Sequence, residues 1–378
     1  MFFDTSIHSF DDARRIAQRR LPWMVFDYID GAAGTGYGEC LNRDMMRDVW
    51  LQPRVLNDVE HRDIKSSLFG KETGLPFGIA PMGMCNLVSP DADNILAKFA
   101  AKHRIPVGVP TLASTSLEDM IELAEGHAWF QLYVSGSMDE SNRLLERSEV
   151  AGYDTIVLTV DVPEVGRRPR ELRRGFKMPF RMGPRQFVDF ACHPGWSLPQ
   201  LFKGKPELAN FGGTFGEFDR TRSRAAADWD LLAKMRDRWK GNLVVKGVVS
   251  SGDAMRLKSI GVDAIQVSSH GGRQLDGSVP AILALHEIRQ VLGPDIQLFY
   301  DSGIRSGEDI VKAYAIGADF VFLGRPISMA IAAAGERGLH QMVGLLSEEV
   351  SIALAQLGLR KLGDITTDAL AKRSGSFI

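Results

Sequence analysis

The chain has 378 residues, of which 44% are hydrophobic and 24% are charged, and its formal net charge at pH 7 is -2. This near-neutral balance provides no overall attraction to nucleic acid, so we expect no nucleic-acid partner. The three cysteines are odd in number and lack a CxxC spacing, which argues against a disulfide framework or a zinc site, and we expect no metal.

Residues 1–70 precede the first predicted strand and form an N-terminal extension that includes a helical segment. The chain begins "MFFDTSIHSFDDARRIAQRR", in which acidic and basic residues alternate without the apolar core of a signal peptide. No apolar run in the sequence is long enough to span a bilayer. These features predict a cytoplasmic protein, or at most one attached peripherally to the inner face of the cytoplasmic membrane.

Eight short apolar runs follow, with amphipathic segments between them. Most are nearly continuous in Val, Ile, Leu and Phe, which is typical of strands buried on both faces. The predicted strands cover residues 76–83, 105–111, 128–134, 155–161, 242–248, 264–270, 297–303 and 319–325. The helices between them open with Ser or Thr caps and close on glycine, as over 114–126, 250–261 and 305–317. This alternation predicts an α/β protein, a TIM (β/α)8 barrel, as a single domain over residues 1–378.

Residues 165–228 interrupt the barrel between its fourth and fifth strands. This insertion is rich in Gly, Pro, Arg and Phe, so we expect a long loop with little regular structure of its own. Between Arg173 and Lys205 it interleaves basic residues with Phe and Trp. Two roles remain open and are compatible with each other: contact with an anionic membrane surface, or a lid that buries its aromatic side chains against the barrel.

The carboxyl ends of parallel barrel strands share one face, and TIM-barrel active sites lie on that face. Polar residues and glycines gather at the predicted ends: Gly83, Thr111, Gln131, Tyr133, Thr159, Asp161, Lys246, Ser268, His270, Asp301, Arg305, Gly324 and Arg325. At the last two ends, "DSGIRSGED" and "FLGRP" place glycine and arginine at helix starts, where backbone N–H groups and the helix dipole favour an anion. The sequence therefore predicts a phosphorylated cofactor or substrate.

The stretch "SSHGGRQLDG" places a histidine beside a cation at one of these ends. His270 is suited to accept a proton near neutral pH, and Asp161 could orient it and stabilise its cation. Arg273 could bind a carboxylate through a bidentate pair. Lys246 is either a buried ion-pair partner or a cation that holds charge on an electron-rich ring. A base beside a carboxylate clamp indicates oxidation, or proton removal, at the carbon next to a carboxylate.

The ordered motifs "LPWMVFDYIDGAA", "IAPMG", "WFQLYV", "LTVDVP", "VVKGV", "SSHGGRQLDG", "DSGIRSG" and "GADFVFLGRP" resemble the FMN-dependent α-hydroxy-acid oxidoreductases. That family includes glycolate oxidase, lactate oxidase, flavin L-lactate dehydrogenase and mandelate dehydrogenase, and the likeness covers nearly the whole chain. The insertion, through "CHPGWSLPQLFKGKPELANF", is most similar to that of the bacterial membrane-associated lactate dehydrogenases.

The resemblance implies FMN as cofactor, oxidation of an L-2-hydroxy acid to a 2-oxo acid, and a homotetramer or a multiple of one. It implies that His270 is the base, paired with Asp161, and that Tyr133 and Lys246 assist catalysis. The substrate would contact Tyr28, Tyr133, Arg168 and Arg273. FMN would contact Pro81, Met82, Gly83, Thr111, Gln131, Thr159, Lys246, Ser268, Asp301, Gly303, Arg305, Gly324 and Arg325.

The sequence departs from the family pattern near the substrate. Pro110 and Leu112 replace a hydroxyl residue and, in some members, a tryptophan, which predicts a roomier pocket that accepts side chains larger than methyl. Ser269 replaces the usual Asn before the base and shortens a side chain that ties down the loop. Gly83 stands where many oxidases carry Ala.

Three alternatives remain beside a dehydrogenase with a quinone-type acceptor at a membrane surface. An oxidase would share the first half-reaction but release hydrogen peroxide. A non-redox FMN isomerase would need no carboxylate clamp, so Arg168 and Arg273 weigh against it. A non-catalytic FMN-binding protein would not need His270. Transfer as hydride and transfer through a carbanion both remain open.

Overall fold

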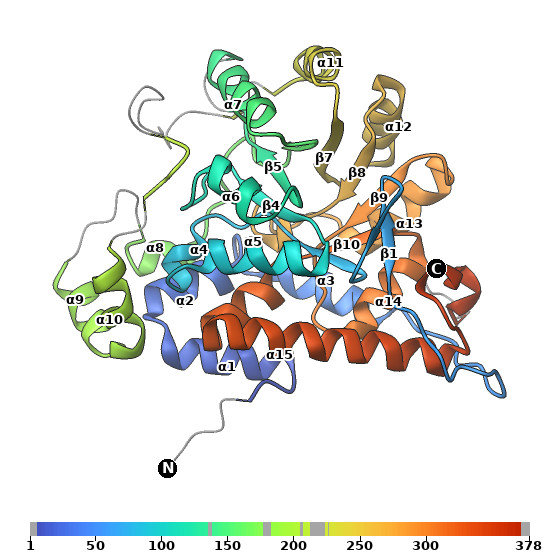
Figure 1. Ribbon diagram of the computed structural model, residues 1–378, viewed down its shortest axis with the longest axis horizontal. Coiled ribbons are helices and arrows are strands. Elements are labelled where there is room, and N and C mark those ends of the chain that lie inside the picture. Colours follow the sequence, from blue (N-terminus) through green and yellow to red (C-terminus); the bar gives the residue numbers. More distant parts are fainter. Residues whose placement is uncertain are drawn as a thin grey trace.

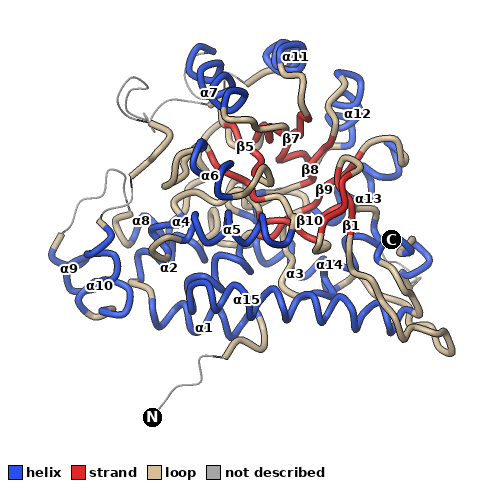
Figure 2. Tube along the Cα trace, viewed as in Figure 1, coloured by secondary structure: helices blue, strands red, loops and turns tan. Residues whose placement is uncertain are grey.

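The computed structural model describes residues 6–134, 138–176, 183–204, 207–211, 224–225 and 227–371. Eight parallel strands form a closed barrel in the order β10-β3-β4-β5-β6-β7-β8-β9, which confirms the predicted TIM barrel. Figure 2 shows these strands at the centre of the molecule with helices around them. The strands are β3 (Phe77–Ile79), β4 (Val107–Pro110), β5 (Ala128–Leu132), β6 (Thr155–Thr159), β7 (Asn242–Val248), β8 (Ala264–Val267), β9 (Gln297–Tyr300) and β10 (Phe320–Leu323).

Helices connect the barrel strands and cover their outer face. They are α4 (Cys85–Val88), α5 (Ala92–His103), α6 (Leu117–Leu123), α7 (Met138–Val150), α11 (Trp229–Arg238), α12 (Ser251–Ile260), α13 (Ala281–Leu292), α14 (Gly307–Ile316) and α15 (Arg325–Leu357). The N-terminal extension supplies α1 (Phe10–Arg20), α2 (Trp23–Asp30) and α3 (Tyr37–Arg47). Helix α1 packs along α15, which bends at Ala334 and Gly335 (Figure 1). Two short 3-10 turns, Leu362–Asp364 and Thr367–Ala369, follow α15.

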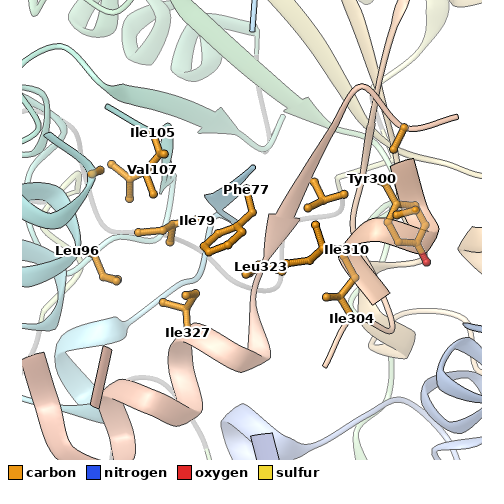
Figure 3. Packing of buried hydrophobic residues seen from close by; sticks show 14 of the residues in the cluster. Phe77, Ile79, Leu96, Ile105, Val107, Tyr300, Ile304, Ile310, Leu323 and Ile327 are labelled. Carbon is orange, nitrogen blue, oxygen red and sulfur yellow. The ribbon is translucent and has the colours of Figure 1, made fainter. Parts of the chain in front are cut away.

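Alternation along each strand divides the core into two layers. In β10, Phe320 and Phe322 point into the barrel and join an inner cluster, whereas Val321 and Leu323 join the outer cluster beneath the helices. Figure 3 shows part of the outer layer, where side chains of β3 and β10 lie beside Ile327 of α15. Because both faces are buried, the strands are nearly continuous in apolar residues.

A hairpin closes the end of the barrel at which the strands begin. It is made of β1 (Ser66–Leu68) and β2 (Lys71–Thr73), and it was not predicted from the sequence. Phe69 at its tip donates its backbone N–H to the side chain of Gln297, the first residue of β9. The Phe69 ring also lies 5.7 Å from those of Trp129 and Phe299 inside the barrel. The opposite, carboxyl end is therefore the one that can hold a site.

The insertion between β6 and β7 is more regular than expected. Its described residues include α8 (Pro169–Arg173), α9 (Pro184–Ala191) and α10 (Pro194–Lys203), so the prediction of little regular structure is wrong for this part. Each helix has proline at its first position, where the missing N–H costs no hydrogen bond. Residues 177–182, 205–206, 212–223 and 226, which include part of the basic and aromatic stretch, lie outside the described residues.

Candidate active site

A histidine and an aspartate face each other at the carboxyl end of the barrel. His270 lies just after β8 in a 3-10 turn (His270–Gly272), and its φ of 54° is in the left-handed region. Its Nδ1 lies 3.0 and 3.1 Å from the two carboxylate oxygens of Asp161, which follows β6. The carboxylate favours the tautomer with the proton on Nδ1, which leaves Nε2 free to accept one. The left-handed backbone conformation of His270 is strained, and such strain is typical of a functional position.

Their surroundings set the charges of the pair. Burial lowers the pKa of His270 below its ordinary value, and the nearby charge of Lys246 adds to this, while Asp161 opposes it. Burial alone would raise the pKa of Asp161, but the charges of His270 and Lys246 outweigh it and hold that pKa below its ordinary value. At neutral pH the pair is therefore a neutral imidazole beside a carboxylate, which is the form that can take up a proton.

Lys246 supplies a buried cation next to this pair. Its Nζ donates to Ser268 Oγ at 2.9 Å and lies 3.3 Å from Asp301 Oδ2. Burial works against its charge, but Asp301 and Asp161 outweigh burial and raise the pKa of Lys246. The strand register shifts after Lys246, at Gly247, which has a φ of 102°. A Cβ there would lie 2.5 Å from Asp161 Cγ, so only glycine lets the carboxylate lie against β7.

Two guanidinium groups lie on the other side of the cavity. Arg273 donates to the Gly31 carbonyl at 2.7 Å, and Arg168 Nε donates to the backbone carbonyl of Arg273 at 3.2 Å. Tyr28 donates to the Gly83 carbonyl at 2.9 Å, and its ring stacks on Phe176 of the insertion at 4.7 Å between centroids. These contacts hold Tyr28, Arg168 and Arg273, the residues predicted to bind the substrate, although they come from different parts of the chain.

One cavity of about 630 Å³ brings most of the predicted site residues together. Its lining includes Tyr28, Pro81, Met82, Gly83, Gln131, Tyr133, Arg168, Lys246, His270, Arg273, Asp301, Gly303, Arg305, Gly324 and Arg325. This volume falls within the range of roughly 300–1,000 Å³ that is usual for ligand sites.

Four predicted site residues lie behind the cavity wall instead. Thr111 is fully buried and bonds the Gln131 carbonyl and the Tyr133 N–H, so it joins the ends of β4 and β5. Ser268, Asp161 and Thr159 also lie outside the lining of the cavity. Ser268 acts through its neighbours, since its hydroxyl accepts from Lys246 and donates to Asp301 at 2.7 Å.

The residues present fit a bound FMN. Among the described residues, four buried donors or acceptors at predicted cofactor positions make no hydrogen bond: Gln131 Nε2, Thr159 Oγ1, Arg305 Nε and Arg325 Nε. Buried polar groups are nearly always bonded, so four orphans at one mouth indicate a polar ligand. The arginines follow β9 and β10, where the sequence predicted a phosphate.

Gly303 is constrained by its packing against α3, and it also lines the cavity in which FMN is predicted to bind. A Cβ at this position would lie 2.8 Å from the carbonyl oxygen of Asn42 in α3, and its φ is 89°. The close approach of α3 therefore explains this glycine without a phosphate. Gly324 remains compatible with one, since the nearest atom to its Cβ position is 3.9 Å away.

Several residues that shape the site gave no recognisable signal in the sequence. Asn42 accepts from Ser269 Oγ and from the Ala281 N–H, both at 3.0 Å, so the shorter serine still ties the His270 loop down. Ser302 accepts from the N–H groups of Ser269 and Gly271. Glu171 and Arg224 also line the cavity. Ser302 lies within the motif "DSGIRSG", but Asn42, Glu171 and Arg224 lie outside the quoted motifs, and only the fold places the four beside the site.

Comparisons with known proteins identify the family. The family described as "FMN-dependent dehydrogenase" matches residues 17–372. The chain is 35% identical to (S)-mandelate dehydrogenase of Pseudomonas putida over 97% of this chain and 94% of that protein. It is 34% identical to L-lactate dehydrogenase of Pseudomonas syringae pv. syringae over 97% of this chain and 99% of that protein.

Solved structures agree with this assignment. The crystal structure of the monotopic membrane protein (S)-mandelate dehydrogenase superposes with a TM-score of 0.91 at 35% identity, covering 97% of this chain and 100% of that one. A mandelate oxidase superposes with a TM-score of 0.84 at 34% identity, covering 98% and 99%. The chain therefore belongs to the FMN-dependent dehydrogenase family and is an FMN-dependent hydroxy-acid oxidoreductase.

Proposed function

We propose that the protein oxidises an L-2-hydroxy acid with a bulky apolar side chain to the 2-oxo acid and passes the electrons to a quinone-type acceptor at a membrane surface. The observation that carries this proposal is that His270, held from behind by Asp161, lines the same cavity as Arg168 and Arg273. FMN, when bound, supplies the two-electron acceptor for the oxidation.

The side chains have distinct tasks in this reaction. Arg168 and Arg273 bind the substrate carboxylate and so hold its 2-hydroxyl group toward His270. His270 Nε2 takes a proton from the substrate, and Asp161 stabilises the imidazolium that forms. Lys246 provides a fixed positive charge beside Ser268 and Asp301, two of the residues predicted to contact FMN.

The apolar part of the cavity lining supports a bulky substrate side chain. It includes Val88, Leu112, Val162, Val165, Leu172 and Phe176. Gly83 adds no side chain, and its Cβ position has Leu112 and the Tyr28 hydroxyl as its nearest neighbours. Two of the relatives, a dehydrogenase and an oxidase, are named for mandelate, whose side chain is a phenyl ring.

An anaerobic screen of 2-hydroxy acids tests the proposed substrate class. We expect acids with a phenyl or branched apolar side chain to reduce the flavin with kcat/KM about 100-fold above that for glycolate, because each buried methylene contributes roughly tenfold or more. Flavin absorbance gives the rate. Leu112→Trp should reduce this preference by filling the pocket, and a wild-type enzyme that favours glycolate would contradict the proposal.

The electron acceptor is tested by the second half-reaction. Enzyme reduced by its substrate is mixed with air-saturated buffer or with a soluble quinone in a stopped-flow instrument. We expect reoxidation by the quinone to be the faster of the two. Faster reoxidation by O₂ with release of hydrogen peroxide would instead identify an oxidase, the activity named for the mandelate oxidase relative.

The helix pair of the insertion supports attachment to a membrane surface. One face is docked, since Trp196 is buried and donates to the Leu87 carbonyl at 3.0 Å. The other face exposes apolar side chains of α9 and α10: Phe187 (63%), Val188 (60%), Leu198 (55%), Leu201 (77%) and Phe202 (88%). Figure 1 shows this pair at the edge of the molecule, away from the barrel.

This exposed face favours a monotopic rather than a spanning attachment. Within the described ranges, no helix has both the length and the apolar character needed to cross a bilayer. The solved relative is itself described as a monotopic membrane protein. The sequence left two roles open for the insertion, a lid and a membrane contact, and its described aromatic residues support both. Phe176 packs on Tyr28, as expected of a lid, whereas Phe202 is exposed, as expected of a membrane contact.

Vesicle partition tests the attachment. We expect Phe202→Asp to reduce partition to vesicles that contain anionic lipid by about tenfold or more, because a charge replaces a buried apolar group at the interface. Sedimentation of protein with vesicles measures the bound fraction. Met255→Asp, which changes a half-exposed methionine on α12, is the matched control. Equal partition of both variants and the wild type would exclude this face as the contact.

A further inference from the structure

A carboxylate lies inside the cluster of arginines that binds the substrate. Glu171, in α8, is only 8% exposed and lines the active-site cavity. Its Oε1 accepts from Arg273 Nη2 at 3.0 Å and lies 3.6 Å from Arg168 Nη1. One carboxylate oxygen is thus shared between the two guanidinium groups that would hold the substrate.

Without Glu171, the guanidinium groups around it would carry a large excess of positive charge. Arg325 donates to the same Gly31 carbonyl as Arg273, at 2.8 and 2.7 Å, so a third guanidinium lies close by. Burial, and then the charge of Arg168, lower the pKa of Arg273, whereas Glu171 opposes that shift. Other titratable groups also face the three arginines: Tyr28 beside Arg273, His270, Tyr133 and Arg224 beside Arg168, and Glu39 and Asp30 beside Arg325. The carboxylate that acts on Arg273 itself is Glu171. Glu171 is therefore the negative charge that stabilises the buried cation of Arg273.

Other side chains of the α8 segment attach this helix to the rest of the protein. Asp27 of α2 accepts from Arg170 Nε at 2.9 Å and from Arg174 Nε at 3.0 Å. Arg170 also pairs with Asp30 at 2.7 Å. These ion pairs attach α8 to α2, so this attachment does not require Glu171 to be buried and turned toward the cavity.

We propose that Glu171 is a positioning and specificity-determining residue of the substrate site: it holds both guanidinium groups and cancels one of their two charges, so that the site is matched to a substrate with one carboxylate. The inference rests on the proposed function, because it assigns Arg168 and Arg273 to the substrate carboxylate. With Glu171 in place this pair carries a net charge of about +1, and a single carboxylate neutralises it. A second carboxylate on the substrate would meet the charge of Glu171, and the mismatch excludes it.

The test measures binding to the oxidised holoenzyme, without turnover. Isothermal titration calorimetry is carried out with phenylglyoxylate, a 2-oxo monoacid, and with 2-oxoglutarate, a 2-oxo diacid. We expect the wild type to bind the monoacid at least about tenfold more tightly. Glu171→Gln should shift the ratio of the two affinities toward the diacid by about tenfold, because one negative charge beside the ligand is lost. Glu171→Asp keeps the charge and should retain most of the preference.

Asp27→Asn is the matched control, since it breaks a buried ion pair of α8 without touching the clamp. It should leave the affinity ratio unchanged. An equal shift in Asp27→Asn and Glu171→Gln, or none in Glu171→Gln, overturns the assignment in favour of a structural role. A wild type that binds both acids equally overturns it even if Glu171→Gln fails to fold.

Kinetics separates this inference from the proposed function. In Glu171→Gln we expect KM for a 2-hydroxy monoacid to rise about tenfold, because the guanidinium groups lose the carboxylate that positions them and this loss outweighs the gain in positive charge. The limiting rate of flavin reduction should change less, since His270 is untouched. If no 2-hydroxy acid reduces the wild-type flavin, the proposed function fails, while the calorimetric ratio still decides the role of Glu171. If reduction occurs but the ratio is the same in Glu171→Gln, only the role of Glu171 fails.

Discussion

Replacement of His270 by alanine is expected to slow reduction of the flavin by a 2-hydroxy acid by roughly 10,000-fold, at the upper end of the range for general-base catalysis. The reason is that Nε2 of His270 accepts the substrate proton. The other ring nitrogen, Nδ1, lies 3.0 Å from Asp161, which holds the ring in place. The variant should still bind FMN, because the orphaned buried donors belong to other residues. Anaerobic stopped-flow absorbance measures the rate, and the spectrum before mixing reports the bound flavin.

His286→Ala is the control for this variant, since His286 lies on α13 and bonds only to Gln290 of the same helix among its described contacts. It should reduce as fast as the wild type. A His270→Ala variant that bleaches rapidly would remove His270 from the role of base and leave the chemistry to another group in the cavity.

The pH dependence follows from the lowered pKa of His270. The base acts in its neutral form, so the rate should stay constant down to the ordinary histidine range and fall only as pH drops through the lowered pKa. Asp161→Asn removes an interaction that raises this pKa, so the acid limb should move to still lower pH. The plateau should fall as well, because the imidazolium loses its partner.

The barrel could be predicted from the sequence because its physical cause is local. Each strand is buried on both faces, as in β10, where Phe320 and Val321 belong to different core layers, so the apolar run stands out in the chain. The hairpin of β1 and β2 could not be found this way. Its strands are three residues long and include exposed polar residues, and long-range contacts stabilise it, among them those of Phe69 and Leu68 with the inner cluster of the barrel.

The insertion shows where composition misleads. Proline and glycine suggested a loop, yet Pro169, Pro184 and Pro194 each begin a helix. Proline suits the first turn of a helix, so these three positions mattered more than the number of prolines, although Pro199 lies inside α10.

The core of the site was predictable for the same reason as the barrel. His270 and Asp161 are 109 residues apart, but both follow strands, and the carboxyl ends of parallel strands meet. Glu171 could not be recognised, because it lies in the charged run "RRPRELRR", which is typical of an exposed helix. Only the fold shows that this one carboxylate turns inward to the arginines.

Lys246→Met is expected to lower the free energy of unfolding by about 3–5 kcal/mol, the usual cost of removing one partner of a buried ion pair. Lys246 lies between Asp301 and Asp161, and both are buried carboxylates that the apolar methionine would leave without their cation. Urea unfolding of the holoenzyme with excess FMN, followed by circular dichroism, measures the change. Bound FMN stabilises the folded state by an amount that depends on its dissociation constant, so the dissociation constant of each variant is measured as well and its contribution is subtracted.

The double variant Lys246→Met with Asp301→Asn decides whether the uncompensated charge is the cause. Because it removes both members of the pair, it should be more stable than the sum of the two single changes predicts, by about 1–3 kcal/mol. The pKa of Lys246 is raised in the folded state, so its contribution should be complete at neutral pH and disappear only as pH rises through that raised value. Additive effects of the two substitutions would show instead that Lys246 stabilises the barrel by packing alone.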